Sequence, residues 1–195
     1  MTPIQVGILL FEEIEVLDFA GPFEVFSLAE KNNTKLFNVH TIGESESVIH
    51  ARNGLKVVPN FNIQNHPKLD ILIIPGGYGA EEITIKNNTI LNWIKDQYQK
   101  VEIMASVCTG ALLLAECGIL DYKKATTHWM DIDRLENEYP NVTAVRNTKF
   151  VDEGNLITSG GISAGINMSF HLVKKLFDHE TAELLAKRMV YDIEL

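Results

Sequence analysis

Cys108 is the residue in this sequence best placed to act as a nucleophile. An apolar run over residues 104–107 leads into it, and Thr109 and Gly110 then open a segment of helical period. A cysteine at such a strand-to-helix turn lies beside the free amides and partial positive charge of a helix N-terminus, which lower a thiol pKa. We therefore expect a reactive thiolate at this position, although free cysteine is more often a small buried core residue.

A glycine-rich segment, Pro75-Gly76-Gly77-Tyr78-Gly79, follows an apolar run and is the second candidate. Glycines at the end of a strand permit positive φ and let bare amides face a cavity. This predicts an anion or oxyanion site, with a tight strand-to-helix connection as the structural alternative. The segment lacks the Gly-Lys-Ser/Thr ending of a phosphate loop, and no G-x-G-x-x-G motif opens the first helix, so we expect no nucleotide cofactor.

Two further side chains, those of Asp18 and His128, are candidates for acid or base catalysis. Asp18 lies between apolar neighbours where the first strand gives way to a helix, and it is either an N-cap or a functional carboxyl. His128, beside Trp129, is a possible base for Cys108, although a lone histidine is more often structural. The remaining histidines show no metal-ligand spacing and H-E-x-x-H is absent, so we expect neither a metal nor any other cofactor.

Composition narrows the class of protein. The chain has 195 residues, 46% hydrophobic, with a formal net charge of −9 and no Lys/Arg run, which argues against nucleic acid as a partner. The apolar stretch near the N-terminus is too short for a membrane span and no basic segment precedes it. Cys117 lies mid-helix among leucines and is assigned to the core, so there is no disulfide framework. A cytoplasmic protein without a membrane partner is expected.

Strand and helix patterns alternate along the chain. Strands are predicted over residues 6–11, 38–42, 55–58, 71–74 and 102–107. Helices are predicted over residues 18–31, 88–99, 109–117, 165–176 and 181–191. Residues 149–152 and 155–158 look like a hairpin or an added pair of strands. The alternation predicts one α/β domain over residues 1–195, with a mostly parallel sheet and helices on both faces. Ligands of such sheets gather at the carboxyl ends of the strands, where all three candidate segments lie.

Six motifs in order resemble the ThiJ/PfpI (class I glutamine-amidotransferase-like) superfamily over nearly the whole chain. They are Leu10-Phe11, the segment 17–26, the segment 75–79, Ser106-Val107-Cys108-Thr109-Gly110-Ala111, Ala125-Thr126-Thr127-His128-Trp129 and the segment 158–166. The resemblance implies a flavodoxin-like α/β sandwich, usually a homodimer, with the cysteine in a strained turn. Within the superfamily the chain is most similar to the isocyanide (isonitrile) hydratases and to the sensor domains of AraC-type regulators.

The residues at and near the cysteine differ between branches of the superfamily, and those of this chain resemble the hydratases more than the proteases or glyoxalases. The protease or amidase branch places a histidine after the cysteine, where this chain has Thr109. The glyoxalase branch holds its cysteine with a glutamate, and the corresponding position here looks like Asp18, with Glu15 as the alternative. The chain ends at Leu195, which leaves no room for a helix-turn-helix pair, so we expect an enzyme rather than a regulator.

The resemblance therefore implies a lyase acting on a small electrophile, with Cys108 attacking an isocyanide carbon to give a thioimidate. Asp18 is expected to move the proton, and Thr109 and the Gly77 amide to orient substrate, carboxyl or water. Other residues are assigned from motif position alone: Gly76, Tyr78 and Gly110 to the substrate or oxyanion, and Trp129 and Ile162 to the pocket lining. The alternatives are a glyoxalase-like enzyme using His128 or Glu15, and a non-enzymatic cysteine sensor oxidised to the sulfinate.

Overall fold

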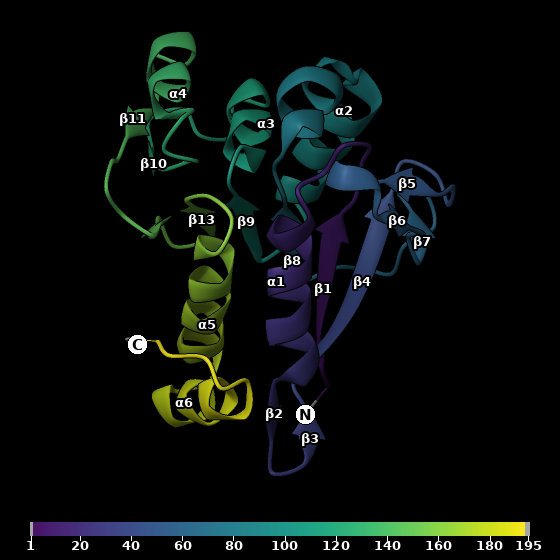
Figure 1. Ribbon diagram of the computed structural model, residues 1–195, viewed down its shortest axis with the longest axis vertical. Coiled ribbons are helices and arrows are strands. Elements are labelled where there is room, and N and C mark those ends of the chain that lie inside the picture. The colour runs from purple at the N-terminus through teal and green to yellow at the C-terminus, as the bar shows by residue number, and fades with distance from the viewer. Residues whose placement is uncertain (1, 194–195) are drawn as a thin grey trace.

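A seven-stranded sheet forms the centre of the computed structural model, which describes residues 2–193 (Figure 1). Its strands are β1 (Ile4–Leu9), β4 (Phe37–Gly43), β7 (Phe61–Asn62), β8 (Ile71–Ile74), β9 (Ile103–Val107), β12 (Phe150–Asp152) and β13 (Leu156–Ser159). They lie in the order β12-β13-β9-β8-β1-β4-β7. All pairings are parallel except that of β12 with β13. The two strands at residues 149–158 are thus an antiparallel hairpin added to a parallel sheet.

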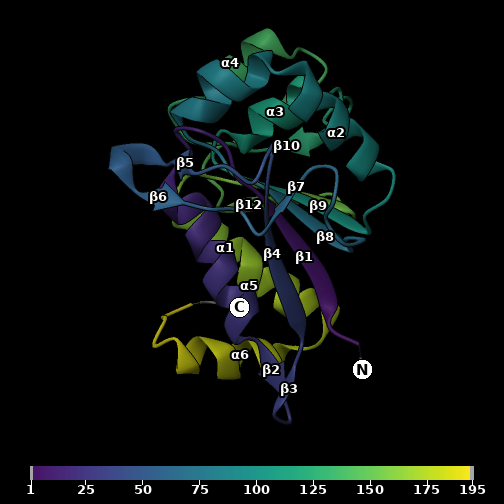
Figure 2. The same ribbon diagram turned by 90° about the vertical axis from the view of Figure 1, so that its right-hand side faces the viewer.

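Helices cover both faces of this sheet. On one side, α1 (Val16–Leu28) packs against α5 (Ala164–Leu176), and α5 packs against α6 (His179–Arg188). On the other side lie α2 (Asn88–Tyr98) and α3 (Gly110–Glu116), as the turned view in Figure 2 shows. A mostly parallel sheet between two helical layers is the flavodoxin-like arrangement, which confirms the predicted fold class.

The residue types explain these elements. Every residue of β8 and β9 is buried, because both strands are central and covered on both faces. In α2, Ile90, Leu91 and Ile94 are buried, and their spacing places them on one face of the helix. Within residues 2–193 no helix is long and apolar enough to cross a membrane.

The sequence prediction was wrong at residues 55–58, which do not join the central sheet. Only β6 (Lys56–Val57) forms there, paired with β5 (Ile49–His50). Several short elements were not predicted. They are β2 (Glu30–Lys31), β3 (Thr34–Lys35), β7, β10 (Lys124–Ala125), α4 (Ile132–Glu138), β11 (Thr143–Ala144) and helical turns at Arg52–Gly54, Gly79–Ile83 and Thr84–Lys86. The two- and three-residue elements carry too little periodicity to be read from a sequence, and α4, with 7 residues, spans only about two helical turns.

The order of the strands brings the candidate residues together. β1, β8 and β9 are neighbours and run in the same direction, so their carboxyl ends meet at one edge of the sheet. The segments that follow them carry Asp18, Gly76 and Cys108, respectively. Residues separated by up to 90 positions in the chain therefore lie around one site.

Candidate active site

Cys108 lies at the turn between β9 and α3 in a left-handed backbone conformation, with φ of 55°. Its amide donates to the carbonyl oxygens of Ser159 and Gly160, each at 3.2 Å. Its carbonyl oxygen accepts a hydrogen bond of 2.8 Å from Thr127 Oγ1. These three bonds hold a conformation that non-glycine residues rarely adopt. The strained turn implied by the resemblance is present, and it fixes the direction of the thiol.

Asp18 lies in the first turn of α1 and is fully buried. It is not the N-cap of this helix, which is Glu15. Asp18 Oδ2 accepts a 3.0 Å hydrogen bond from the amide of Gly76, whereas Oδ1 has no hydrogen-bond partner among the described residues. One oxygen of the carboxyl is therefore anchored and the other is free, an arrangement suited to moving a proton.

Burial raises the pKa of Asp18 to about 8. Two hydrogen-bond donors, the Gly76 amide and the Cys108 side chain, lower the pKa of Asp18 and so oppose the effect of burial. The negative charge of Glu15 raises it. Asp18, rather than Glu15, is thus the carboxyl beside the thiol, and Glu15 acts on it through charge. Because Oδ2 accepts the Gly76 amide, the proton that Asp18 carries at neutral pH belongs on Oδ1.

The expectation of a lowered thiol pKa is wrong. Burial is the largest cause of a pKa raised well above the ordinary cysteine value, because Cys108 is only 6% exposed. The negative charge of Asp18 raises it further. The amides of Thr109 and Ile162 point toward the sulfur and oppose the rise, but they do not outweigh burial. The two groups titrate together, and near neutral pH the pair holds both protons and carries no charge.

The glycine segment after β8 supports this pair. The amide of Gly77 donates 2.9 Å to Thr109 Oγ1, and that hydroxyl donates 3.4 Å to the Gly77 carbonyl. The Gly76 carbonyl accepts 2.9 Å from the amide of Glu15. Both glycine amides are therefore engaged by Asp18 or Thr109 and do not face an open cavity as expected. They position the carboxyl and the helix start.

The glycines also allow close approach of backbones. A Cβ on Gly76 would lie 2.5 Å from the Thr109 nitrogen, and one on Gly110 would lie 2.1 Å from the Ile74 carbonyl oxygen. Gly77 has φ of 115°, a conformation that favours glycine. Gly110 thus packs α3 onto β8. Tyr78 follows at the rim, 49% exposed, with the Arg52 guanidinium 5.6 Å from its ring centre.

The opposite side of the thiol is formed by two segments. Ile162 has φ of 48°, rare for a β-branched residue, and this turns its amide toward Cys108. The His128 ring lies against Gly161, where a Cβ would come within 1.9 Å of it. His128 Nδ1 lies 3.6 Å from Asp131 Oδ2. Trp129 points outward and is 77% exposed.

Sequence reasoning missed Asp131. Its negative charge contributes to the raised pKa of Cys108. The only signal was its position three residues after His128, in a polar segment with nothing else to single it out. Cys117 is half-buried, and its thiol lies 3.5 Å from the carbonyl oxygen of Leu91, away from the site. Within residues 2–193, no cluster of three or more His, Cys, Asp or Glu side chains is arranged to hold a metal.

Comparison with known proteins places this site in a family. The DJ-1/PfpI family profile matches residues 4–175. Isonitrile hydratase of Pseudomonas putida is 33% identical over 189 residues, which cover 96% of this chain and 78% of that protein. The transcriptional regulator GbdR of Pseudomonas aeruginosa is 25% identical over 97% of this chain, which spans about half (51%) of the regulator.

A solved structure gives the same picture in three dimensions. The crystal structure of a THiJ/PfpI family protein from Pseudomonas syringae superposes with a TM-score of 0.88 at 26% identity. The superposition covers 100% of this chain and 78% of that one. The family profile, the related sequence and the superposed fold agree, and the chain belongs to the DJ-1/PfpI family.

Proposed function

We propose that this protein is a cysteine-dependent hydratase that converts isocyanides to N-substituted formamides. The observation that carries the proposal is the uncharged Cys108–Asp18 pair, in which a buried carboxyl with one unpaired oxygen, Oδ1, lies close enough to a buried thiol for each group to shift the pKa of the other. Similarity to isonitrile hydratase, at 33% identity, supports this choice of substrate.

In the first step, the sulfur of Cys108 bonds to the terminal carbon of the isocyanide R–NC. That carbon also gains a proton, which Asp18 delivers from Oδ1 while it takes up the proton of the thiol. The product is a thioimidate, Cys–S–CH=N–R, and the step neither oxidises nor reduces any group. An uncharged pair suits this addition, because neither the pair nor the neutral substrate places a net charge in the buried site.

Water completes the reaction. Its oxygen bonds to the thioimidate carbon, the nitrogen gains a proton, and Asp18 relays the proton that water gives up. The C–S bond of the resulting tetrahedral intermediate then breaks. The thiol recovers its proton from the new hydroxyl group through Asp18, and R–NH–CHO leaves. The sum of the steps is R–NC plus water giving the formamide.

The remaining residues act by position. Thr109 holds the Gly77 loop, which in turn fixes Asp18 through the Gly76 amide. The amides of Thr109 and Ile162 stabilise negative charge on sulfur as the C–S bond breaks. Tyr78 and Ile162 are exposed near the site and would contact the R group.

The alternatives receive less support from the site. A glyoxalase-like enzyme was expected to use His128 or Glu15, but the pKa of the thiol responds to Asp18 and Asp131 instead. A peroxide sensor needs an abundant thiolate, and the raised pKa of Cys108 opposes this.

The test is hydration of cyclohexyl isocyanide by the purified protein, followed through formamide formation. Turnover is expected in the wild type and in Cys117→Ala, and none in Cys108→Ala. Turnover that persists in Cys108→Ala would reject the covalent mechanism. Absence of turnover in the wild type, with methylglyoxal consumed instead, would favour the glyoxalase-like alternative.

A further inference from the structure

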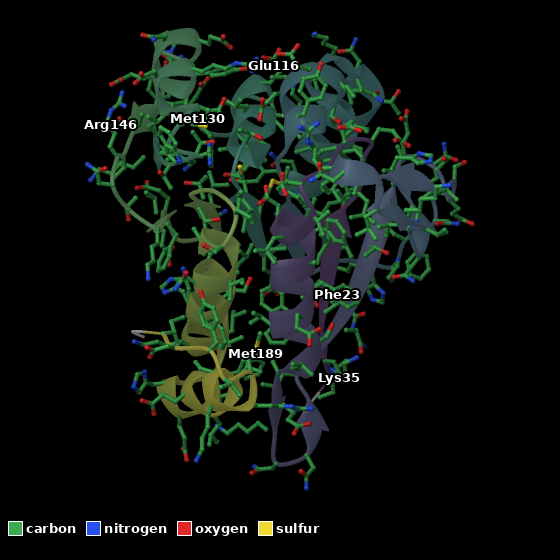
Figure 3. All side chains as sticks on the ribbon, in the orientation of Figure 1. Phe23, Lys35, Glu116, Met130, Arg146 and Met189 are labelled. Atoms are coloured by element: carbon green, nitrogen blue, oxygen red, sulfur yellow. The ribbon has the colours of Figure 1, made fainter. Side chains whose placement is uncertain are left out.

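A cavity of about 560 Å³ is lined by Thr127 and Gly160, two of the residues that hydrogen-bond the backbone of Cys108. It is bounded by the segment after β10, by the connection from β11 to β12 and by the start of α5. Figure 3 labels Arg146 on that connection, close to β11. The volume falls within the range of small-molecule sites, which is about 300–1,000 Å³.

The charged side chains that line this cavity, in the part of the chain that the structure describes, are all basic. Of residues 2–193, Arg146 and Lys149 line it and no Asp or Glu does, although the chain has 26 acidic and 17 basic residues. Arg146 pairs with Asp133 at 2.7 Å and Glu136 at 2.5 Å, whereas Lys149 has no ion pair among residues 2–193. The N-terminus of the 13-residue helix α5 adds partial positive charge at Ser163 and Ala164. An anion fits this environment.

Two nearly buried polar side chains in the cavity wall each have a donor without a partner among the described residues. Thr126 is 2% exposed, and its hydroxyl makes no hydrogen bond with any described residue. Asn167 is 7% exposed; its Oδ1 accepts 3.4 Å from the Tyr191 hydroxyl, and its Nδ2 has no partner within the described part of the chain. Neither donor is among the fully enclosed unpaired atoms of residues 2–193, so both are open to the cavity and free to bond a ligand there.

The remaining lining sets the shape of that ligand. Trp129 and Ile132 present apolar surface to the cavity. The cavity is distinct from the proposed active site, because neither Cys108 nor Asp18 lines it. The two share a wall, since Thr127 lines the cavity and donates to the Cys108 carbonyl oxygen.

We propose that this cavity binds a small organic carboxylate with an apolar body. Its carboxylate would lie between Lys149 and the start of α5 and accept hydrogen bonds from Thr126 and Asn167. Its apolar part would lie against Trp129. The proposal does not depend on the reaction at Cys108.

The experiment titrates the protein with benzoate, and in parallel with benzamide, which has the same ring and no charge. Binding is followed by calorimetry and by tryptophan fluorescence, because Trp129 is 77% exposed at the cavity and Trp93 is 8% exposed elsewhere. Benzoate is expected to bind and benzamide to bind much more weakly. Cys108→Ala should bind benzoate as the wild type does, which separates this site from the active site.

Two variants locate the ligand. Lys149→Gln should weaken benzoate binding by roughly 2- to 5-fold, as expected for a solvent-exposed ion pair. The matched control Lys68→Gln makes the same charge change outside the cavity and should leave binding unchanged. Thr126→Val should weaken binding by roughly 3- to 10-fold without lowering the melting temperature of the free protein, because the hydroxyl it removes has no partner there.

Three outcomes would overturn the proposal. They are equal affinity for benzoate and benzamide, equal benzoate affinity in Lys149→Gln and Lys68→Gln, and no benzoate binding at all. A fourth outcome, loss of benzoate binding in Cys108→Ala, would place the ligand at the active site and would likewise overturn the proposal.

Discussion

Replacing Asp18 with asparagine should stabilise the protein, and the gain should grow with pH. The carboxyl is buried with a pKa of about 8, against 3.8 for the free side chain. Between these values the unfolded chain releases a proton that the folded protein keeps, so stability falls as pH rises. An asparagine at this position retains an acceptor for the Gly76 amide and carries no charge to bury.

The magnitude follows from the two pKa values. Each unit of pH between them changes the free energy of unfolding by about 1.4 kcal/mol. Asp18 therefore costs about 3 kcal/mol at pH 6 and about 5 kcal/mol at pH 8, as upper limits, and almost nothing near pH 4. Above pH 9 the raised pKa of Cys108 adds a second contribution of the same sign, so the measurement stays below that pH.

The assay is urea unfolding at about pH 4.5, 6 and 8, comparing the wild type with Asp18→Asn. Glu24→Gln is the control: it removes one exposed carboxyl from the same helix, and its effect should stay within about 0.5 kcal/mol at every pH. Two results would refute the conclusion that Asp18 is protonated at neutral pH. One is a stability difference between the wild type and Asp18→Asn that does not change with pH. The other is an Asp18→Asn variant that becomes less stable than the wild type as pH rises.

Three further predictions concern Cys108 and its neighbours. Asp18→Asn should lower isocyanide turnover by about 100-fold or more, as expected for loss of a general acid/base; a rate near that of the wild type would exclude this role. Wild-type turnover should fall as pH rises through about 8, where Asp18 loses its proton, and a rate that climbs through this range would contradict the assignment. Iodoacetamide should alkylate Cys108 slowly at pH 8 and faster in Asp18→Asn, because one negative charge beside the sulfur is removed; mass spectrometry of the two cysteines measures this, and equal rates would argue against the coupling.

Much of the fold was predictable because the strongest sequence signals come from its largest elements. The residues of β8 form a short, fully apolar run and were predicted with the same bounds, and the spacing of α2 gave its buried face. The short strands that pair outside the central sheet were not predictable. Their pairing depends on partners brought near by the rest of the fold, as at Lys56–Val57.

The site was only partly predictable for a different reason. Residue type and position at strand ends singled out Cys108 and Asp18, but ionisation depends on burial, which the sequence does not display. The thiol was therefore expected to be a thiolate and is instead neutral in the free protein. The left-handed conformation of Ile162 was equally hidden, because sterics alone disfavour it for a β-branched residue. Only the surrounding structure imposes it.

The glycine contacts beneath the site show which of its positions tolerate substitution and which do not. A single methyl group at Gly76 or Gly110 would collide with backbone atoms, so neither position tolerates even alanine without displacing the reacting pair. The Tyr78 side chain, by contrast, is 49% exposed at the rim of the site. Mutagenesis that seeks a new substrate range should therefore randomise this rim and leave the floor untouched, since selectivity and chemistry are held by separate groups of residues.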